Sequence, residues 1–168
     1  ARLMMSDPKK FMPVANEVRL DVETEVEGVP VRLVGIIDRV FRDEDDGLGL
    51  MELKTGKWNP TYKLSDMRME MSYYKMLIEM TDPALLAEKG LTGDVTHWGW
   101  RYSAADHMTY EKCKPVSERA MKVRLGKLVK MYLNEKFDMV NSGSREGWKC
   151  SRCDYMQYCP QFQAEASV

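Results

Sequence analysis

The sequence predicts an α/β (α+β) fold with a central mixed β-sheet flanked by helices, and three observations predict it. Residues 17–26 alternate apolar and charged side chains with a period of two, which is typical of a half-buried strand. Residues 31–41 are apolar on both faces, as in the central strand of a sheet. Residues 63–80 and 115–137 carry apolar side chains at helical spacing instead, so we expect helices to cover the sheet.

The first three expected strands form an antiparallel meander over residues 17–55. The Glu-Gly pair at 27–28 predicts the first turn. The polar stretch 42–47 closes on Asp-Gly, a hairpin signal, and predicts the second turn. The third strand then covers residues 48–55.

Two helices are expected after the meander. Residues 63–80 form the first, and Ser65 is a plausible N-cap for it. Residues 83–90 predict a short second helix that ends at Gly90.

The rest of the chain returns to the sheet before it ends in a long helix. Residues 94–103 read as a strand, and 107–113 as its hairpin partner. The long amphipathic helix covers 115–137, and Pro115 suits its first turn. Because strands both precede and follow the helices, the expected sheet is mixed.

Composition limits the classes of protein. The chain has 168 residues, enough for one domain with its own core, and its net charge of −1 gives no general support for nucleic-acid binding. No stretch has the ~20 apolar residues that span a bilayer, and no signal peptide is visible, so we expect a soluble cytoplasmic protein. The chain does not begin with Met, which suggests a fragment. We expect a core over residues 1–140 that lacks its N-terminal segment, with a cysteine-containing tail, 141–168, packed on it.

Three charged residues interrupt the apolar strands of the meander. Glu52 and Lys54 are two positions apart and share a face, and the hairpin brings Asp38 roughly opposite Glu52. Two such carboxylates repel each other unless a divalent cation joins them, and Mg²⁺ prefers one or two carboxylates with water and a substrate phosphate. A nearby lysine can orient or deprotonate a water, or neutralise the attacked phosphate. The alternative is a solvated acid–lysine pair at a strand end.

The surrounding residues favour the metal site. Gly35 lies three positions before Asp38, Lys-Thr-Gly follows at 54–56, and a helix comes next. "GIIDRV", "MELKTGK" and that helix resemble the PD-(D/E)XK nuclease superfamily, specifically its RecB-like branch and the CRISPR-associated and archaeal or viral exonucleases within it. The resemblance covers residues from about 17 to 80 and the C-terminal cysteines. It implies a restriction-endonuclease-like core and a deoxyribonuclease that uses Mg²⁺ or Mn²⁺.

The resemblance also assigns roles to single residues. Asp38 and Glu52 correspond to metal ligands, and the backbone carbonyl of Leu53 to a third ligand. Lys54 corresponds to the catalytic lysine. The helix 63–80 corresponds to a Q-x-x-x-Y helix with Tyr74 in the tyrosine position, although Tyr74 could equally be a core aromatic.

The chain departs from the branch at two places. Glu70 stands where relatives usually have Gln and cannot donate as an amide does, so it could instead meet Lys54, Arg68 or a second metal. Many relatives carry a metal-ligating His upstream of the first Asp, whereas both histidines of this chain lie downstream of Asp38. The upstream segment could be missing, or Glu17 could serve instead, although Glu17 reads better as a solvated strand residue.

The cysteines predict a second metal centre. Cys150, Cys153 and Cys159 form the pattern C-x₂-C-x₅-C-P, which suits Zn²⁺ or an iron–sulfur cluster. The resemblance favours a [4Fe–4S] cluster in the full-length protein, with a fourth ligand upstream of the core. Cys113 is the in-chain candidate for that ligand, and a buried thiol is the alternative. The clustered cysteines could also be reduced thiols, and the cluster could be absent from this fragment.

We therefore expect a metal-dependent DNA nuclease, an exonuclease or an enzyme that processes single strands or ends. Its partners would be DNA and proteins of recombination, repair or CRISPR adaptation. The alternatives are a non-catalytic DNA-binding or assembly module of such a complex and a zinc-ribbon-like interaction protein. Aromatic residues on the later strands could stack on single-stranded bases, although sheet packing explains them more simply: Trp98, Trp100, Tyr102 and Tyr110.

Overall fold

The chain divides into two compact units, residues 1–126 and 127–168, and each is described here by itself. A computed structural model describes residues 12–43, 46–58, 60–105, 107–135, 150, 152–154 and 156–159. The expected tail from residue 141, packed on the core, stays a prediction, because most of it lies outside the described residues.

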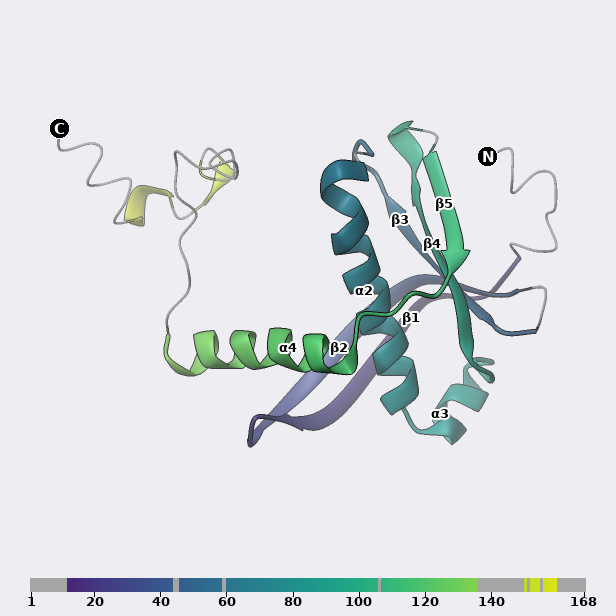
Figure 1. Ribbon diagram of the computed structural model, residues 1–168, viewed down its shortest axis with the longest axis horizontal. Helices are drawn as coiled ribbons and strands as arrows, with labels where there is room; N and C mark the ends of the chain where they lie inside the picture. Colours follow the sequence, from purple (N-terminus) through teal and green to yellow (C-terminus); the bar gives the residue numbers. More distant parts are fainter. Residues whose placement is uncertain are drawn as a thin grey trace. The chain divides into compact units, whose positions relative to one another are not determined.

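A five-stranded mixed sheet forms the centre of the first unit in the described part of the chain, in the order β1-β2-β3-β4-β5 (Figure 1). Neighbouring strands are antiparallel except for β3 and β4, which are parallel. The predicted meander and the predicted mixed sheet are both confirmed. The strands are β1 Pro13–Val26, β2 Val29–Arg42, β3 Leu48–Lys54, β4 Val95–Tyr102 and β5 His107–Lys112.

Helices connect β3 to β4 and follow β5. The helices are α2 Pro60–Met80, α3 Pro83–Glu88 and α4 Glu118–Leu133, with short 3₁₀ turns at Ser103–Ala105 and Met156–Tyr158. Within the described ranges, none of the helices is both long and apolar enough to cross a membrane.

Two predicted helix starts are wrong. Helix α2 begins at Pro60, so Ser65 lies inside the helix and is not its N-cap. Proline suits a first helical turn because it lacks only an N–H that would have no partner there. Helix α4 begins at Glu118, after Pro115, and the hydroxyl of Ser117 accepts a hydrogen bond from the backbone N–H of Ala120.

Helix α2 packs on one face of the sheet and buries the main core. Gly35 on β2 permits this close approach, since a Cβ at that position would lie 2.6 Å from Leu77 and 3.3 Å from the ring of Tyr74. The glycine therefore brings the Tyr74 end of α2 down onto β2. The core side chains come from all the strands except β5, from α2, and from the segment before β4: Val18, Leu20, Val22, Ile37, Val40, Leu48, Leu50, Met67, Met71, Tyr74, Leu77, Ile78, Leu91, Val95, Trp98, Trp100 and Tyr102.

The strand aromatics are mainly packing residues. Trp98 and Trp100 are fully buried, and Tyr102 is 3% exposed, which confirms the simpler of the two sequence interpretations. Phe41 and Met51 form a second, smaller cluster with Met108 and Tyr110.

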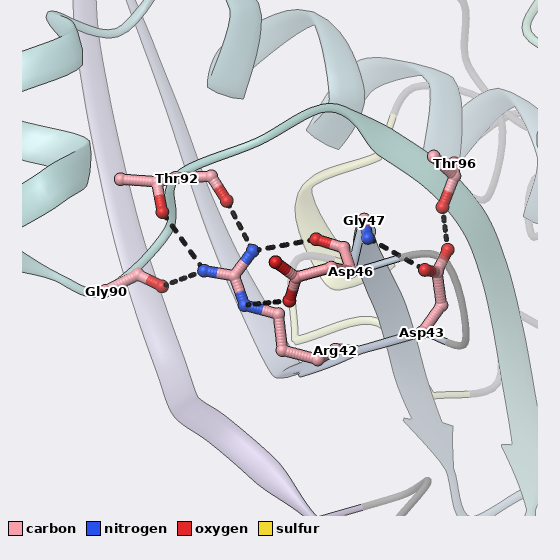
Figure 2. Close-up of polar contacts among 7 residues, drawn as sticks. All are labelled: Arg42, Asp43, Asp46, Gly47, Gly90, Thr92 and Thr96. Atoms are coloured by element: carbon pink, nitrogen blue, oxygen red, sulfur yellow. Dashed lines mark hydrogen bonds and ion pairs between the residues drawn. The ribbon is translucent and has the colours of Figure 1, made fainter.

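Arg42 fastens the loop between β2 and β3 to the chain that enters β4 (Figure 2). Its guanidinium donates to the carbonyls of Asp46, Thr92 and Gly90 at 3.1, 2.5 and 3.2 Å, and to the Thr92 hydroxyl at 3.1 Å. The side chain of Asp46 adds an ion pair at 3.9 Å. One guanidinium thus satisfies four acceptors that belong to two loops.

Asp43 completes this connection from the next position. Its carboxylate accepts from the backbone N–H of Gly47 at 2.8 Å and from the hydroxyl of Thr96 (Figure 2). Nδ1 of His97 lies 2.9 Å from the same carboxylate, which can only accept, so Nδ1 carries a proton. We call Arg42 and Asp43, with the groups that they bind, the hairpin clamp. It holds β3 beside β4 at the end where both strands begin.

Candidate active site

The five residues singled out in the sequence come from two strands and one helix. Asp38 lies on β2, Glu52 and Lys54 on β3, and Glu70 and Tyr74 on α2. The β2–β3 ladder includes Arg39 opposite Met51, so Asp38 and Glu52 occupy the next position on the two strands. Hydrogen bonds and electrostatic effects link all five groups directly or through one another, so the structure brings the predicted set together.

Asp38 sits where β2 changes the side that it presents to α2. Ile37 and Val40 both belong to the core under α2, although strict alternation would place them on opposite faces. The change coincides with Glu17 on β1, which has a φ of 50°. Oδ2 of Asp38 turns to the next strand and accepts the backbone N–H of Leu53 at 2.7 Å. This bond fixes the carboxylate beside β3.

Lys54 bridges two carboxylates. Its Nζ lies 2.6 Å from Oε1 of Glu52 and 3.0 Å from Oε1 of Glu70. Burial by itself would lower the pKa of Lys54, but the hydrogen bonds to the two glutamates outweigh burial and raise that pKa. The lysine is therefore held in its charged form. Of the partners considered for Glu70, the structure shows Lys54.

Glu52 is a buried acid that lies near two other carboxylates. It is 7% exposed, and its Oε2 is buried without a hydrogen-bond partner among the described residues. Burial raises the pKa of Glu52, and the charges of Glu70 and Asp38 raise it further, whereas Lys54 lowers it. A buried carboxylate oxygen without a partner costs free energy, so a further positive group beside Glu52 would stabilise it.

Tyr74 approaches these carboxylates from the helix. It is 8% exposed and packs against Gly35, so it is also part of the core. Burial raises the pKa of its hydroxyl, and the charges of Glu52, Glu70 and Asp38 add to the effect. The hydroxyl therefore keeps its proton at all ordinary pH values and remains a hydrogen-bond donor.

The residues present fit a divalent cation. Within the described ranges, no three His, Cys, Asp or Glu side chains converge as a metal cluster. Mg²⁺ does not require three, because one or two carboxylates with water and substrate phosphate suffice. The unpartnered oxygen of Glu52 is the observation that fits, and Asp38 would be the second carboxylate. The carbonyl of Leu53 as a ligand stays a prediction.

Three basic residues, Lys57, Lys63 and Arg68, flank the site in the sequence. Arg68 forms two hydrogen bonds with the carboxylate of Glu111, at 2.7 and 2.6 Å, which join α2 to β5. Lys57 is exposed in the loop after β3. The side chain of Lys63 lies outside the described residues.

The cysteines fall into two groups along the chain. Cys113 packs against the main core, and burial raises the pKa of its thiol to about 12, as expected for a buried thiol. Cys150, Cys153 and Cys159 lie in the second unit, where backbone hydrogen bonds link them through successive turns. They do not converge as a metal-binding group in this arrangement.

Sequence reasoning missed one group at this end of the sheet. Trp58 lies between β3 and α2 and stacks on His107 of β5. The available signal was a tryptophan four residues after Lys54, in a loop where burial is not required.

Comparison with known proteins completes the description. No curated protein matches the chain significantly. The crystal structure of SSO0001 is similar in fold, with a TM-score of 0.56 and 17% identity over 96% of this chain. The chain spans 64% of that structure's length. The family model of the PD-(D/E)XK nuclease superfamily matches residues 3–160. The chain therefore belongs to the PD-(D/E)XK nuclease superfamily, whose members are generally metal-dependent nucleases.

Proposed function

We propose that this chain is a divalent-metal-dependent deoxyribonuclease that hydrolyses phosphodiester bonds at Asp38, Glu52 and Lys54. The observation that carries the proposal is the buried Oε2 of Glu52, which has no partner among the described residues, beside a second carboxylate and a charged lysine. A core that served only for folding would have little reason to keep this arrangement, because Lys54 offsets only part of the unfavourable burial of Glu52 and a cation would relieve the rest.

Each side chain has a role that follows from its surroundings. Asp38 and Glu52 would hold the cation, Mg²⁺ or Mn²⁺, which when bound supplies charge stabilisation to the phosphate and lowers the pKa of a water. Asp38 is already oriented by the N–H of Leu53, which reduces the ordering needed on binding. Tyr74, which keeps its proton, can donate a hydrogen bond to an anionic oxygen of the substrate.

Lys54 acts through its charge. Hydrogen bonds from Lys54 to Glu52 and Glu70 raise its pKa, so at neutral pH it is an ammonium group. A lysine in this state stabilises the negative charge that develops on the attacked phosphate. Glu70 holds it in place at 3.0 Å, and this is the function that we assign to an acid where relatives usually carry Gln.

The experiment is incubation of labelled single- and double-stranded DNA with Mg²⁺ or Mn²⁺. We expect cleavage by the wild type, and loss of cleavage in Asp38→Ala, Glu52→Ala and Lys54→Ala with the fold unchanged by circular dichroism. Asp21→Asn is the matched control, because Asp21 is a strand carboxylate that pairs with Arg32 instead. Near-normal rates in the three site variants would show that the site is wrongly assigned. Absence of cleavage in the wild type would favour a non-catalytic DNA-binding module.

The finer proposals rest on the resemblance described above. We propose that the enzyme belongs to the RecB-like branch and acts on ends or single strands, with partners in recombination, repair or CRISPR adaptation. The C-x₂-C-x₅-C-P spacing of Cys150, Cys153 and Cys159 supports a [4Fe–4S] cluster, but their arrangement here does not. Iron content and absorbance near ~400 nm of protein purified without oxygen test the cluster. Colourless protein with stoichiometric zinc would contradict it.

A further inference from the structure

Trp58 and His107 form a flat stack at the edge of the main core. Their ring centroids are 4.6 Å apart and their planes differ by 8°. Trp58 also packs at a tilt against Tyr102 at 5.1 Å and Trp100 at 6.0 Å. The two underlying rings are buried, whereas Trp58 and His107 are each only half-buried. The stack thus has a protected base and a part that faces solvent.

The stack lies at the same end of the sheet as the candidate active site. Lys54 is in register with Tyr102 on β4, and Tyr102 with His107 on β5. Neighbouring strands are about 4.8 Å apart, so the backbones of Lys54 and His107 are separated by roughly 10 Å. The hydroxyl of Ser103 donates to the carbonyl of Lys54 at 3.4 Å and connects the end of β4 to the end of β3. A nucleic-acid strand bound at Lys54 would therefore reach the stack within a short stretch.

Packing alone does not require this arrangement. The tryptophans that serve the core, Trp98 and Trp100, are fully buried. Trp58 comes from the loop between β3 and α2 and keeps part of its ring surface in water. The preceding residue, Lys57, is exposed and adds a positive charge next to Trp58 in the sequence. A half-exposed aromatic stack beside positive charge is how proteins bind single strands without reading sequence.

We propose that Trp58 and His107 form a stacking platform for a base of single-stranded DNA whose backbone lies at Asp38, Glu52 and Lys54. This rests on the proposed nuclease function and deepens it by naming the residues that would bind a base of an unpaired strand. Bases within a duplex are stacked on each other and cannot use such a platform. Every base has a π-face, so we expect little sequence preference.

The test measures binding in the presence of EDTA, so that it does not depend on cleavage. Fluorescence anisotropy with a labelled oligo(dT) gives the affinity of each variant. We expect Trp58→Ala to bind about 5- to 100-fold more weakly than the wild type, the usual range for loss of one base–aromatic stack, and His107→Ala to show a smaller loss. Tyr132→Ala is the control, because Tyr132 is a 73% exposed aromatic residue outside this group. Equal affinity of Trp58→Ala and the wild type would overturn the proposal.

An oligonucleotide with abasic positions separates stacking from charge, because it keeps the phosphates and lacks bases. The wild type should bind it as weakly as Trp58→Ala binds oligo(dT), and Trp58→Ala should lose nothing further. Trp58→Phe keeps a ring over Tyr102 and should retain most of the affinity, which guards against a folding defect in the alanine variant. Equal binding of abasic and normal strands by the wild type would overturn the platform. Normal cleavage by Asp38→Ala and Glu52→Ala would contradict the nuclease proposal alone, because the platform is tested by binding in EDTA.

Discussion

The two ends of β3 carry buried carboxylates in opposite states. Before the strand, in the hairpin clamp, the side chain of Asp43 is 2% exposed and accepts from Gly47, Thr96 and His97. Near its other end, the side chain of Glu52 is 9% exposed, and one of its oxygens has no partner among the described residues. Burial is similar, but only the first carboxylate has its hydrogen bonds satisfied.

Under the proposed function, this difference separates a structural acid, Asp43, from a functional one, Glu52. In a low-dielectric interior a fully satisfied carboxylate stabilises a unique arrangement, whereas one left partly unsatisfied destabilises it. The clamp therefore serves the fold. The other end stores unfavourable charge that a cation would relieve, which is the usual condition of a functional site.

The largest expected effect is on cleavage. Glu52→Gln keeps the shape of the side chain and removes the charge that would hold a cation. We expect the rate to fall by about 10³-fold or more, because a metal contributes several kcal/mol to the transition state. A single-turnover assay on labelled DNA measures it.

Asp43→Asn provides the comparison at the other end of the strand. It also neutralises a buried carboxylate, but we expect the cleavage rate of the folded protein to stay within a few-fold of the wild type. If both substitutions abolish cleavage while the fold persists, the two ends of β3 do not differ as described.

The next largest effect is on stability and lies in the clamp. Arg42→Met removes donors to four acceptors at Asp46, Gly90 and Thr92. We expect the free energy of unfolding to fall by about 2–4 kcal/mol, because the acceptors lose charged donors while Arg42 is only 31% exposed. Urea denaturation followed by circular dichroism measures this loss. A loss below about 0.5 kcal/mol would show that water replaces the guanidinium.

The ion pair between Arg68 and Glu111 should make the free energy of unfolding depend on pH. The hydrogen bonds from Arg68 lower the pKa of Glu111, and burial only partly opposes them. A lowered pKa gives stability that is present above the unfolded pKa, about 4.3, and is lost as the pH falls through the folded pKa. We expect Glu111→Gln to cost about 1–3 kcal/mol at pH 7 and much less below pH 4. A pH-independent difference in urea midpoints would exclude this explanation.

The smallest effect has the opposite sign. Burial raises the pKa of Glu52, so its ionised form destabilises the metal-free fold at neutral pH, and this penalty disappears as the pH falls below the ordinary range of a glutamate. Without divalent cations, Glu52→Gln should therefore raise the free energy of unfolding at pH 7, by about 0.5–2 kcal/mol, the usual size of a stabilising substitution. Thermal melts in EDTA test the sign. A destabilised variant would mean that the pair with Lys54 outweighs burial.

Periodicity and turn residues were sufficient to predict the fold, because each element is locally consistent. The strands, the mixed sheet and the helix over it follow from apolar spacing and from turns at Gly28 and Gly47. The helix starts were wrong by three residues each, because Ser65 and Pro115 look like start signals while the local signals at Pro60 and Ser117 mark the true starts.

The candidate site was partly predictable. Residues close in the hairpin, such as Asp38 and Glu52, follow from register alone. The bridge from Lys54 to Glu70 depends on how α2 packs on the sheet. Gly35 permits that packing, but its contact with α2 is visible only in the folded structure. The stack of Trp58 on His107 joins residues that are far apart in sequence, and no local pattern indicates it.

The central claim is that Glu52, whose Oε2 has no partner among the described residues, binds a divalent cation. Direct binding of Mn²⁺ is the most direct test of this claim. Titration followed by electron paramagnetic resonance counts free Mn²⁺ without any substrate or cleavage. We expect one site in the wild type and in Asp43→Asn, and binding at least about tenfold weaker in Glu52→Gln, since a coordinating charge is lost. Equal Mn²⁺ affinity in the wild type and in Glu52→Gln would contradict the account.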